Sequence, residues 1–103
     1  MDKRMQSPAI DFLFDAILNL KTKEECYEFF DDLCTVKELL SMAQRMEVAK
    51  MLKEEKTYVE ISEKTGASTV TISRVNRILN YGNDSLRNCL NRLVDVTEEE
   101  SKQ

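Results

Sequence analysis

The sequence predicts an all-α fold, a six- or seven-helix domain that carries a helix-turn-helix, and two observations support this prediction. The 103 residues include only two glycines and one proline, and their apolar positions repeat at helical spacing without the alternation typical of strands. Signals for helix starts also recur along the chain, as a Ser-Pro pair and the Thr-x-x-Glu boxes that begin at Thr22, Thr35 and Thr57. These starts divide the chain into successive helices.

The first two expected helices begin at such signals. Ser7 and Pro8 suit the N-cap and the first position of a helix. In a Thr-x-x-Glu box the threonine hydroxyl and the glutamate carboxylate each accept from an exposed backbone N–H, and the box at Thr22 starts the second helix. The apolar stripes of these two helices consist of Ile10, Leu13, Phe14, Ile17 and Leu18, and of Cys26, Phe29, Phe30 and Leu33.

The later helices are marked in the same way. The box at Thr35 starts the longest helix, and the box at Thr57 starts the next one. If the longest helix is broken into two, the chain has seven helices rather than six. Gly82 is expected to end the helix before last. Asn83 or Asp84 then caps the last helix.

Residues 58–80 match the pattern of a helix-turn-helix. Gly66 lies between two apolar-periodic segments, where a sharp turn favours glycine. In the helix before it, Val59 and Ile61 are expected to supply apolar bulk. The helix after it carries one buried stripe at i, i+3 and i+7, formed by Ile72, Val75 and Leu79.

The opposite arc of the second helix is predicted to bind DNA. Its hydroxyl groups can bond phosphates or base edges, an exposed valine can touch a thymine methyl, and arginine can pair with guanine through two hydrogen bonds. The candidate DNA-binding residues are Ser68, Thr69, Val70, Thr71, Ser73, Arg74 and Arg77. Short helix pairs with a central glycine also occur in proteins that bind no nucleic acid, and that alternative stays open.

Composition narrows the class of protein. Apolar residues make up 42% of the chain, which is typical of a globular protein, and no apolar run approaches the length of a membrane span. No signal-peptide pattern opens the sequence, so we expect a soluble, cytoplasmic protein. Residues 7–95 are expected to form a single helical domain, with residues 1–6 as a flexible N-terminus and residues 96–103 as an acidic flexible tail.

Catalytic and metal chemistry are not expected. The chain has no histidine, no glycine-rich phosphate loop and no carboxylate cluster with metal-ligand spacing. Its three cysteines lie on apolar helical stripes without Cys-x-x-Cys spacing, so we expect buried thiols rather than disulfides or a zinc site. The expectation is a protein that is no enzyme and needs no cofactor.

The net charge of −4 is unevenly distributed along the chain. Residues 1–65 carry a net −4 and residues 94–103 a net −3, whereas residues 66–93 carry a net +3. All basic residues of this middle block are arginines, which suit phosphate and guanine recognition: Arg74, Arg77, Arg87 and Arg92. A solvated surface of arginines would give the same count, and a partner protein with acidic residues would also fit a basic face.

The helices carry more apolar surface than a monomer of this size is expected to cover. Phe12 and Leu20 lie off the main stripe of the first helix, and the long helix is apolar over more than one face. Excess apolar faces favour a partner chain, so we expect a symmetric homodimer that addresses successive major grooves at a palindromic site. A monomer that folds these helices back on themselves is the alternative.

The segments TVKELLSMAQRMEVAKML and VEISEKTGASTVTISRVNRIL resemble the Trp repressor superfamily, and most closely its YerC/YecD-type branch of Trp-repressor-like bacterial proteins. The resemblance is good over residues 35–93 and extends to the earlier helices only in pattern. It implies a Trp-repressor-like intertwined dimer with a helix-turn-helix projecting from each end. It also implies transcription regulation, most simply repression.

The resemblance further identifies a possible effector pocket. In the tryptophan-responsive repressor two arginines sandwich the indole ring, and their places match Arg45 and Arg74 here, with Thr71 three residues before the second arginine. However, the glycine that follows the second arginine in the repressor is Val75 here, and the serine that helps bind the ligand's amino group is Ile78. Both changes fill space and remove polarity.

We therefore expect L-tryptophan not to act as a corepressor of this protein. Arg45 and Arg74 then contact phosphate or neighbouring acidic groups, or they serve a different effector in a remodelled pocket. The sequence as a whole predicts a sequence-specific DNA-binding transcriptional regulator that acts as a homodimer. The alternative is a protein-interaction module that docks a partner such as RNA polymerase through the helix-turn-helix face.

Overall fold

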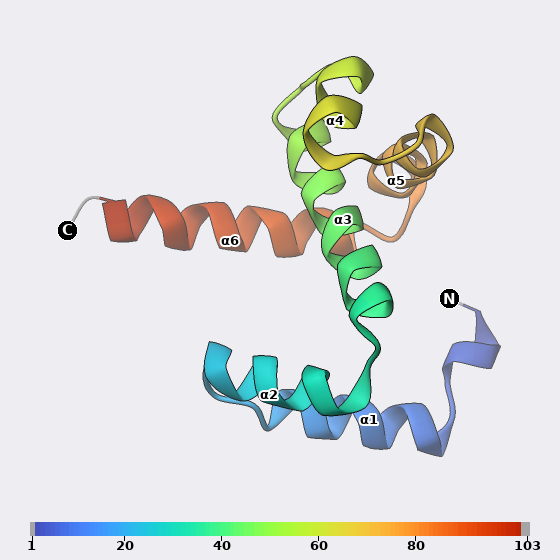
Figure 1. The fold of residues 1–103 in the computed structure, drawn as a ribbon, viewed down its shortest axis with the longest axis vertical. Coiled ribbons are helices and arrows are strands. Elements are labelled where there is room, and N and C mark those ends of the chain that lie inside the picture. The colour runs from blue at the N-terminus through green and yellow to red at the C-terminus, as the bar shows by residue number, and fades with distance from the viewer. Residues whose placement is uncertain (1, 102–103) are drawn as a thin grey trace. The chain divides into compact units, whose positions relative to one another are not determined.

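A computed structural model describes residues 2–101, and the side chains of residues 2–93. The described residues form a short 3₁₀ helix, six α-helices and no strand (Figure 1), which confirms the predicted all-α fold. The elements are η1 (Lys3–Met5), α1 (Pro8–Leu18), α2 (Lys23–Leu33), α3 (Val36–Lys53), α4 (Tyr58–Thr65), α5 (Thr69–Tyr81) and α6 (Ser85–Ser101). None of the helices within the described range is both long and apolar enough to span a membrane.

The predicted helix starts are confirmed. Ser7 is the N-cap of α1, and its hydroxyl accepts from the Ile10 N–H at 3.2 Å. The box before α3 is complete, because the Thr35 hydroxyl accepts from the Glu38 N–H at 3.1 Å and the Glu38 carboxylate accepts from the Thr35 N–H at 2.9 Å. The backbone N–H of Thr35 and then its side chain, both donating to the Glu38 carboxylate, lower the pKa of Glu38.

The other two boxes depart from the full pattern. Before α2, the Thr22 hydroxyl accepts from the Glu25 N–H at 3.1 Å, but the Glu25 carboxylate accepts from the N–H of Lys21, one residue earlier than expected, at 2.8 Å. Before α4, the Thr57 hydroxyl accepts from the Glu60 N–H at 3.1 Å. All three threonines therefore cap their helices, although the returning glutamate bond varies.

The C-terminus of α3 closes with a Schellman motif. The Lys56 N–H donates to the Met51 carbonyl and the Glu55 N–H to the Leu52 carbonyl, each at 3.0 Å. Glu55 has a φ of 62° in this turn, a left-handed conformation that non-glycine residues adopt at some cost. The motif ends α3 without a break in the helix, so the chain has six α-helices within the described range rather than seven.

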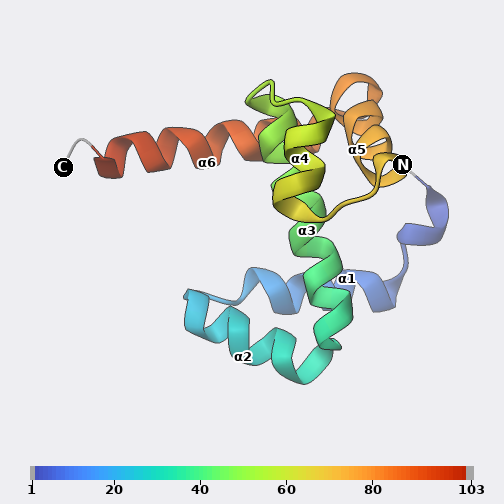
Figure 2. The same ribbon diagram turned by 45° about the horizontal axis from the view of Figure 1, so that its top comes forward.

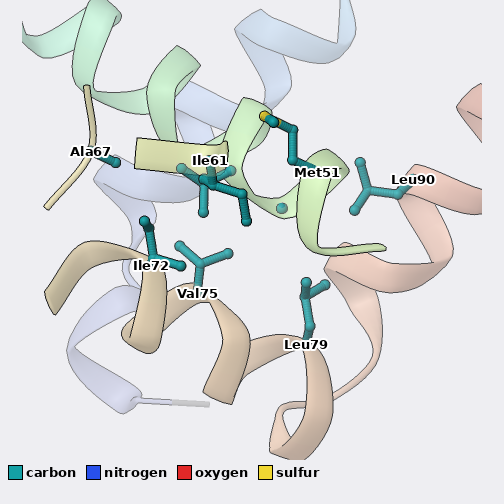
Figure 3. Close-up of a cluster of buried hydrophobic side chains, with 9 residues drawn as sticks. Met51, Ile61, Ala67, Ile72, Val75, Leu79 and Leu90 are labelled. Atoms are coloured by element: carbon teal, nitrogen blue, oxygen red, sulfur yellow. The ribbon is translucent and has the colours of Figure 1, made fainter. Parts of the chain in front are cut away.

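Residues 7–95, predicted to be one domain, are divided between two compact units, residues 1–39 and residues 40–103. The second unit contains the buried apolar core, in which side chains from α3 to α6 meet around α5 (Figure 3). The core consists of Val48, Ala49, Met51, Ile61, Ala67, Ile72, Val75, Leu79 and Leu90. Figures 1 and 2 show α4 and α5 lying against the second half of α3, with α6 beginning beside the end of α5.

The first unit, by contrast, buries none of the side chains described within it. Phe29 and Phe30 meet edge to face with ring centroids 5.2 Å apart. Other large apolar side chains lie open: Phe12 is 75% exposed and Leu18 is 82% exposed. The helices α1 and α2 are therefore amphipathic helices without a core of their own.

The cysteines differ from the prediction of buried thiols. Cys26 is exposed, and Cys34 and Cys89 are half-buried, with all three thiols free. Cys26 and Cys89 lie within α2 and α6, whereas Cys34 is the extended C-cap residue of α2 and therefore lies on no helical stripe. The prediction of buried thiols is therefore wrong.

The two ends of the chain contain more regular structure than their predicted flexibility suggests. Within residues 1–6, the Asp2 carboxylate caps η1 by accepting from the Arg4 N–H at 2.9 Å, and it also pairs with the Arg4 guanidinium at 2.6 Å. Within residues 96–103, α6 continues to Ser101, and the last two residues lie outside the described range. The flexibility of both ends stays a prediction.

Candidate nucleic-acid interface

The turn between α4 and α5 depends on the last residue of α4. The Thr65 hydroxyl donates to the Ile61 carbonyl at 2.7 Å and accepts from the Ala67 N–H at 3.1 Å. Gly66 follows with a φ of 74°, and a Cβ there would meet nothing within 4 Å. The left-handed backbone, rather than a lack of space, therefore requires glycine at this position.

A side chain of α3 also holds this turn. The Gln44 amide donates to the Thr65 carbonyl at 3.1 Å. This carbonyl belongs to the last turn of α4, where backbone acceptors lack partners within the helix. The bond therefore fixes the end of α4 against α3 and sets where α5 begins.

The apolar packing of α4 differs from the prediction at one position. Ile61 is fully buried, as expected, but Val59 is 66% exposed. Residues two apart on a helix point to nearly opposite sides, so both could not enter the same core. The prediction that Val59 supplies core bulk is wrong.

The N-terminus of α5 is capped by a hydroxyl from the predicted DNA-binding set. Ser68 is the N-cap, and its hydroxyl accepts from the Thr71 N–H at 3.2 Å. The same hydroxyl donates to the Thr71 hydroxyl at 3.2 Å. These two residues therefore stabilise the start of α5 in addition to any contact that they make with DNA.

The two faces of α5 separate as the periodicity predicts. Its stripe of Ile72, Val75 and Leu79 is buried, and Figure 3 shows Ile72 and Val75 pointing toward Ile61 of α4. The opposite side consists of exposed residues, and Val70 is 78% exposed. We call this side the α5 face; it consists of Thr69, Val70, Ser73, Arg74 and Arg77. The role of these residues in DNA binding stays a prediction.

The C-terminus of α5 is shaped by a close approach. Gly82 is the C-cap of α5, as predicted, and its N–H donates to the Ile78 carbonyl at 2.9 Å. Its φ of −83° is not left-handed, but a Cβ would collide with the Ile78 carbonyl oxygen. Glycine is thus needed here for space. The following Asn83 side chain accepts from the Ser85 N–H at 3.1 Å at the start of α6.

Arg87 of α6 has a place that the sequence did not predict. Its guanidinium donates to the Leu79 carbonyl from Nη2 at 2.7 Å and from Nε at 3.2 Å. Charge counting had grouped Arg87 with the other arginines of the basic block, as a candidate for phosphate recognition. A basic residue shortly after a helix end is a known signal for carbonyl capping, and it could have indicated this role.

The five residues of the possible effector pocket lie together. Arg45, Thr71, Arg74, Val75 and Ile78 line one hollow of about 370 Å³ between α3 and α5, together with Ser41, Gln44 and Val70. None of the described lining residues is acidic, so neighbouring carboxylates do not explain the two arginines at this hollow. The Arg45 Nε instead donates to the Ser41 carbonyl of its own helix at 3.4 Å.

The two replacements expected to block tryptophan have different surroundings. Val75 is only 3% exposed and belongs mainly to the core, whereas Ile78 is 44% exposed at the rim of the hollow. Space therefore remains at this place, and the hollow is not completely filled by the branched side chains. The expected rejection of tryptophan stays a prediction, resting on lost polarity and changed shape.

Comparison with known proteins agrees with this architecture. The sequence profile of the family described as Trp repressor protein matches residues 8–94. The chain belongs to the Trp repressor family. This family comprises DNA-binding regulators rather than enzymes, and the match includes the α5 face, the hollow and both connections of α5.

Individual proteins show similarity along nearly the whole chain. The uncharacterized protein YerC of Bacillus subtilis (strain 168) is 53% identical over 100 residues, which cover 97% of this chain and 96% of YerC. The crystal structure of a TrpR-like protein from Eubacterium eligens ATCC 27750 superposes with a TM-score of 0.86 at 56% identity, covering 89% of this chain and 95% of that one. A candidate Trp repressor from Staphylococcus aureus gives a TM-score of 0.85 at 53% identity, with coverages of 90% and 94%.

Proposed function

We propose that this protein is a sequence-specific DNA-binding transcriptional regulator, most simply a repressor, and that the α5 face enters the major groove. The observation that carries the proposal is the separation of α5 into a buried stripe and an exposed side of hydroxyl, valine and arginine residues. Such a side supplies hydrogen bonds for phosphates and base edges and an apolar contact for thymine. The rigid turn at Gly66 and Thr65 would hold it in a fixed direction.

We further propose that the protein binds DNA as a homodimer. The helices α1 and α2 bury no described side chain, although Phe12 and Leu18 are largely exposed. Apolar surface of this extent is normally covered in a soluble protein, and a symmetric second copy is the most common partner. Two copies of α5 about 34 Å apart would address successive major grooves and favour a palindromic site.

The charge distribution is compatible with this function despite the acidic total. Arg74 and Arg77 are exposed on the α5 face, and Arg92 is exposed on α6, all within a block of net charge +3. Neutralising DNA phosphates releases counterions, so binding by these arginines is expected to fall steeply as salt increases. The acidic remainder of the chain would weaken nonspecific association with DNA.

The test is selection of bound duplexes from a random pool by the full-length chain at physiological salt. Enrichment of a two-fold symmetric motif is the expected result. Enrichment of an asymmetric motif would contradict binding as a symmetric dimer but would support sequence-specific DNA binding. If no duplex is enriched, the result would favour the alternative, a module that docks a protein partner such as RNA polymerase through the α5 face.

We expect that L-tryptophan does not bind in the hollow between α3 and α5. Selection repeated with candidate small molecules would show whether another effector alters binding. A change in the affinity for the enriched duplex on adding a compound would identify an effector. The Arg45 and Arg74 side chains that line the hollow are the first positions to substitute in that case.

A further inference from the structure

Arg87 links the two helices that follow the turn region, because it belongs to α6 and donates to the last turn of α5. Its Nη2 and Nε atoms both point to one acceptor, the Leu79 carbonyl oxygen, at 2.7 Å and 3.2 Å. The same Nη2 lies 3.4 Å from the side-chain oxygen of Asn80. Arg87 itself is half-buried.

The accepting carbonyl is one that the helix leaves without an internal partner. In a longer helix the Leu79 oxygen would accept from the N–H of residue 83, but α5 ends at Tyr81 and Gly82 turns the chain away. A guanidinium at this place satisfies the carbonyl and also meets the negative end of the α5 dipole. Charge-assisted hydrogen bonds of this kind are stronger than neutral ones.

The contact continues along α5 through two asparagines. The Asn80 side-chain oxygen faces Arg87, while its Nδ2 donates to the Asn76 side-chain oxygen at 3.2 Å. The chain of contacts therefore runs from α6 back across the second half of α5. At the other end of α5, Gln44 fixes the preceding turn through the Thr65 carbonyl. The last turn of α4 in front of α5 and the last turn of α5 are thus each bonded to a side chain from another helix.

We propose that Arg87 is a positioning residue of the DNA-binding surface: it sets the direction of α5 relative to α6 and does not itself contact phosphate. The inference rests on the proposed function, since positioning matters only if α5 binds DNA. In a dimer that reads two half-sites, a fixed direction of α5 sets which half-site spacing both copies can contact at once. Loosening this end would therefore reduce the selectivity for spacing as well as affinity.

The first experiment needs no DNA. Amide hydrogen exchange is compared among the parent, Arg87→Ala and Arg92→Ala, the last being a control at an exposed arginine of the same helix. In Arg87→Ala the amides of residues 80–82 should exchange at least about tenfold faster, because their turn frays. The Ile72 amide and all amides of the control should be unchanged. Unchanged exchange at residues 80–82 in Arg87→Ala would overturn the proposal.

The second experiment uses the duplex enriched by the parent from the random pool and includes Arg87→Lys, which keeps the charge but loses the planar fork. Arg87→Ala should raise the Kd for this duplex about tenfold. It should also bind duplexes whose half-sites lie one base pair closer together or farther apart almost as well as it binds the enriched duplex. Arg87→Lys should recover little of either property. The slope of log Kd against log salt should stay close to that of the parent in both variants.

A phosphate contact would behave differently. Loss of one such contact reduces the salt slope by about one, a lysine substitutes well for a point charge, and spacing selectivity is kept. That combination would overturn the proposal. If the parent enriches no duplex, the proposed function fails, while the exchange experiment still decides whether Arg87 holds the end of α5.

Discussion

Gln44 donates from its side-chain amide to the carbonyl oxygen of Thr65 at 3.1 Å, and this bond connects α3 to the turn in front of α5. The two residues are 21 positions apart in the sequence. Because Gln44 also lines the hollow between α3 and α5, it contacts both the possible effector site and the turn that places the α5 face. The first prediction concerns this residue.

Replacing Gln44 should weaken both folding and DNA binding. Gln44→Glu keeps the size of the side chain but removes its N–H donor and places a charge beside the Thr65 carbonyl. We expect the free energy of unfolding to fall by about 1 to 3 kcal/mol, measured by urea denaturation. Gln44→Asn, with a shorter amide, is the matched control for charge. A Gln44→Glu protein as stable as the parent would show that the bond is not formed in solution.

Arg77→Ala should affect DNA binding without affecting the fold. Arg77 is exposed on the α5 face, so its removal leaves no cavity in the core. The affinity for the enriched duplex should fall by about 1 to 3 kcal/mol, measured by titration at fixed salt, while the melting temperature stays near that of the parent. Equal affinities would remove Arg77 from the DNA-binding residues.

Ile72→Ala should destabilise the fold. Ile72 is fully buried among α3, α4 and α5, so truncation removes apolar contacts and leaves a cavity. The expected loss is about 2 to 5 kcal/mol in the free energy of unfolding, with loss of DNA binding because the direction of α5 is no longer fixed. Val70→Ala, at an exposed position of the same helix, is the control, and its denaturant midpoint should equal that of the parent protein.

The start of α3 should depend on pH through Glu38. The Glu38 carboxylate accepts a hydrogen bond from the Thr35 backbone N–H, and this bond lowers the pKa of Glu38 from the ordinary value of 4.5. Since the folded state has the lower pKa, the stabilisation is complete above pH 4.5 and is lost as pH falls through the lowered pKa. Carboxyl chemical shifts of Glu38 should therefore titrate with a midpoint below 4.5. A midpoint at or above that value would contradict the capping bond. Glu38→Gln is the control, because its side chain can still accept the Thr35 N–H but does not titrate, so the start of α3 should not depend on pH in this variant.

Free L-tryptophan should not bind in the hollow. The chain contains no tryptophan, so the fluorescence of the added amino acid is observed without background from indole groups of the protein. We expect no saturable shift at micromolar protein, because the Ile78 side chain offers the ligand's amino group no hydrogen-bond partner. A saturable shift would overturn this prediction, and its loss in Arg45→Ala would place the ligand in the hollow.

Much of the helix pattern could be predicted because its signals are local. Ser7, Thr22, Thr35 and Thr57 cap helices through residues three positions ahead, and such spacing is visible in a sequence. The buried stripe of α5 was likewise predictable from its period. The family resemblance then placed Arg45 and Arg74 at one hollow, although they belong to different helices.

The missed features depend on contacts between elements. Arg87 of α6 reaches the Leu79 carbonyl of α5 across the connection at Gly82, and a count of charges does not contain that geometry. The exposure of Cys26 depends on what covers α2, which a periodic stripe does not specify. Val59 was predicted to supply apolar bulk because it is apolar, but it lies two positions from the buried Ile61 and therefore points to nearly the opposite side of α4.

The lack of buried side chains among residues 2–39 affects how stable the protein is in a cell. Helices without a core are marginal in water, so in the proposed homodimer α1 and α2 would gain their stability only when the second copy binds. Folding would then be a second-order process, and newly made chains at low abundance would expose these helices to proteases. The amount of protein would thereby set its own lifetime, and a regulator built in this way would disappear quickly once its synthesis falls.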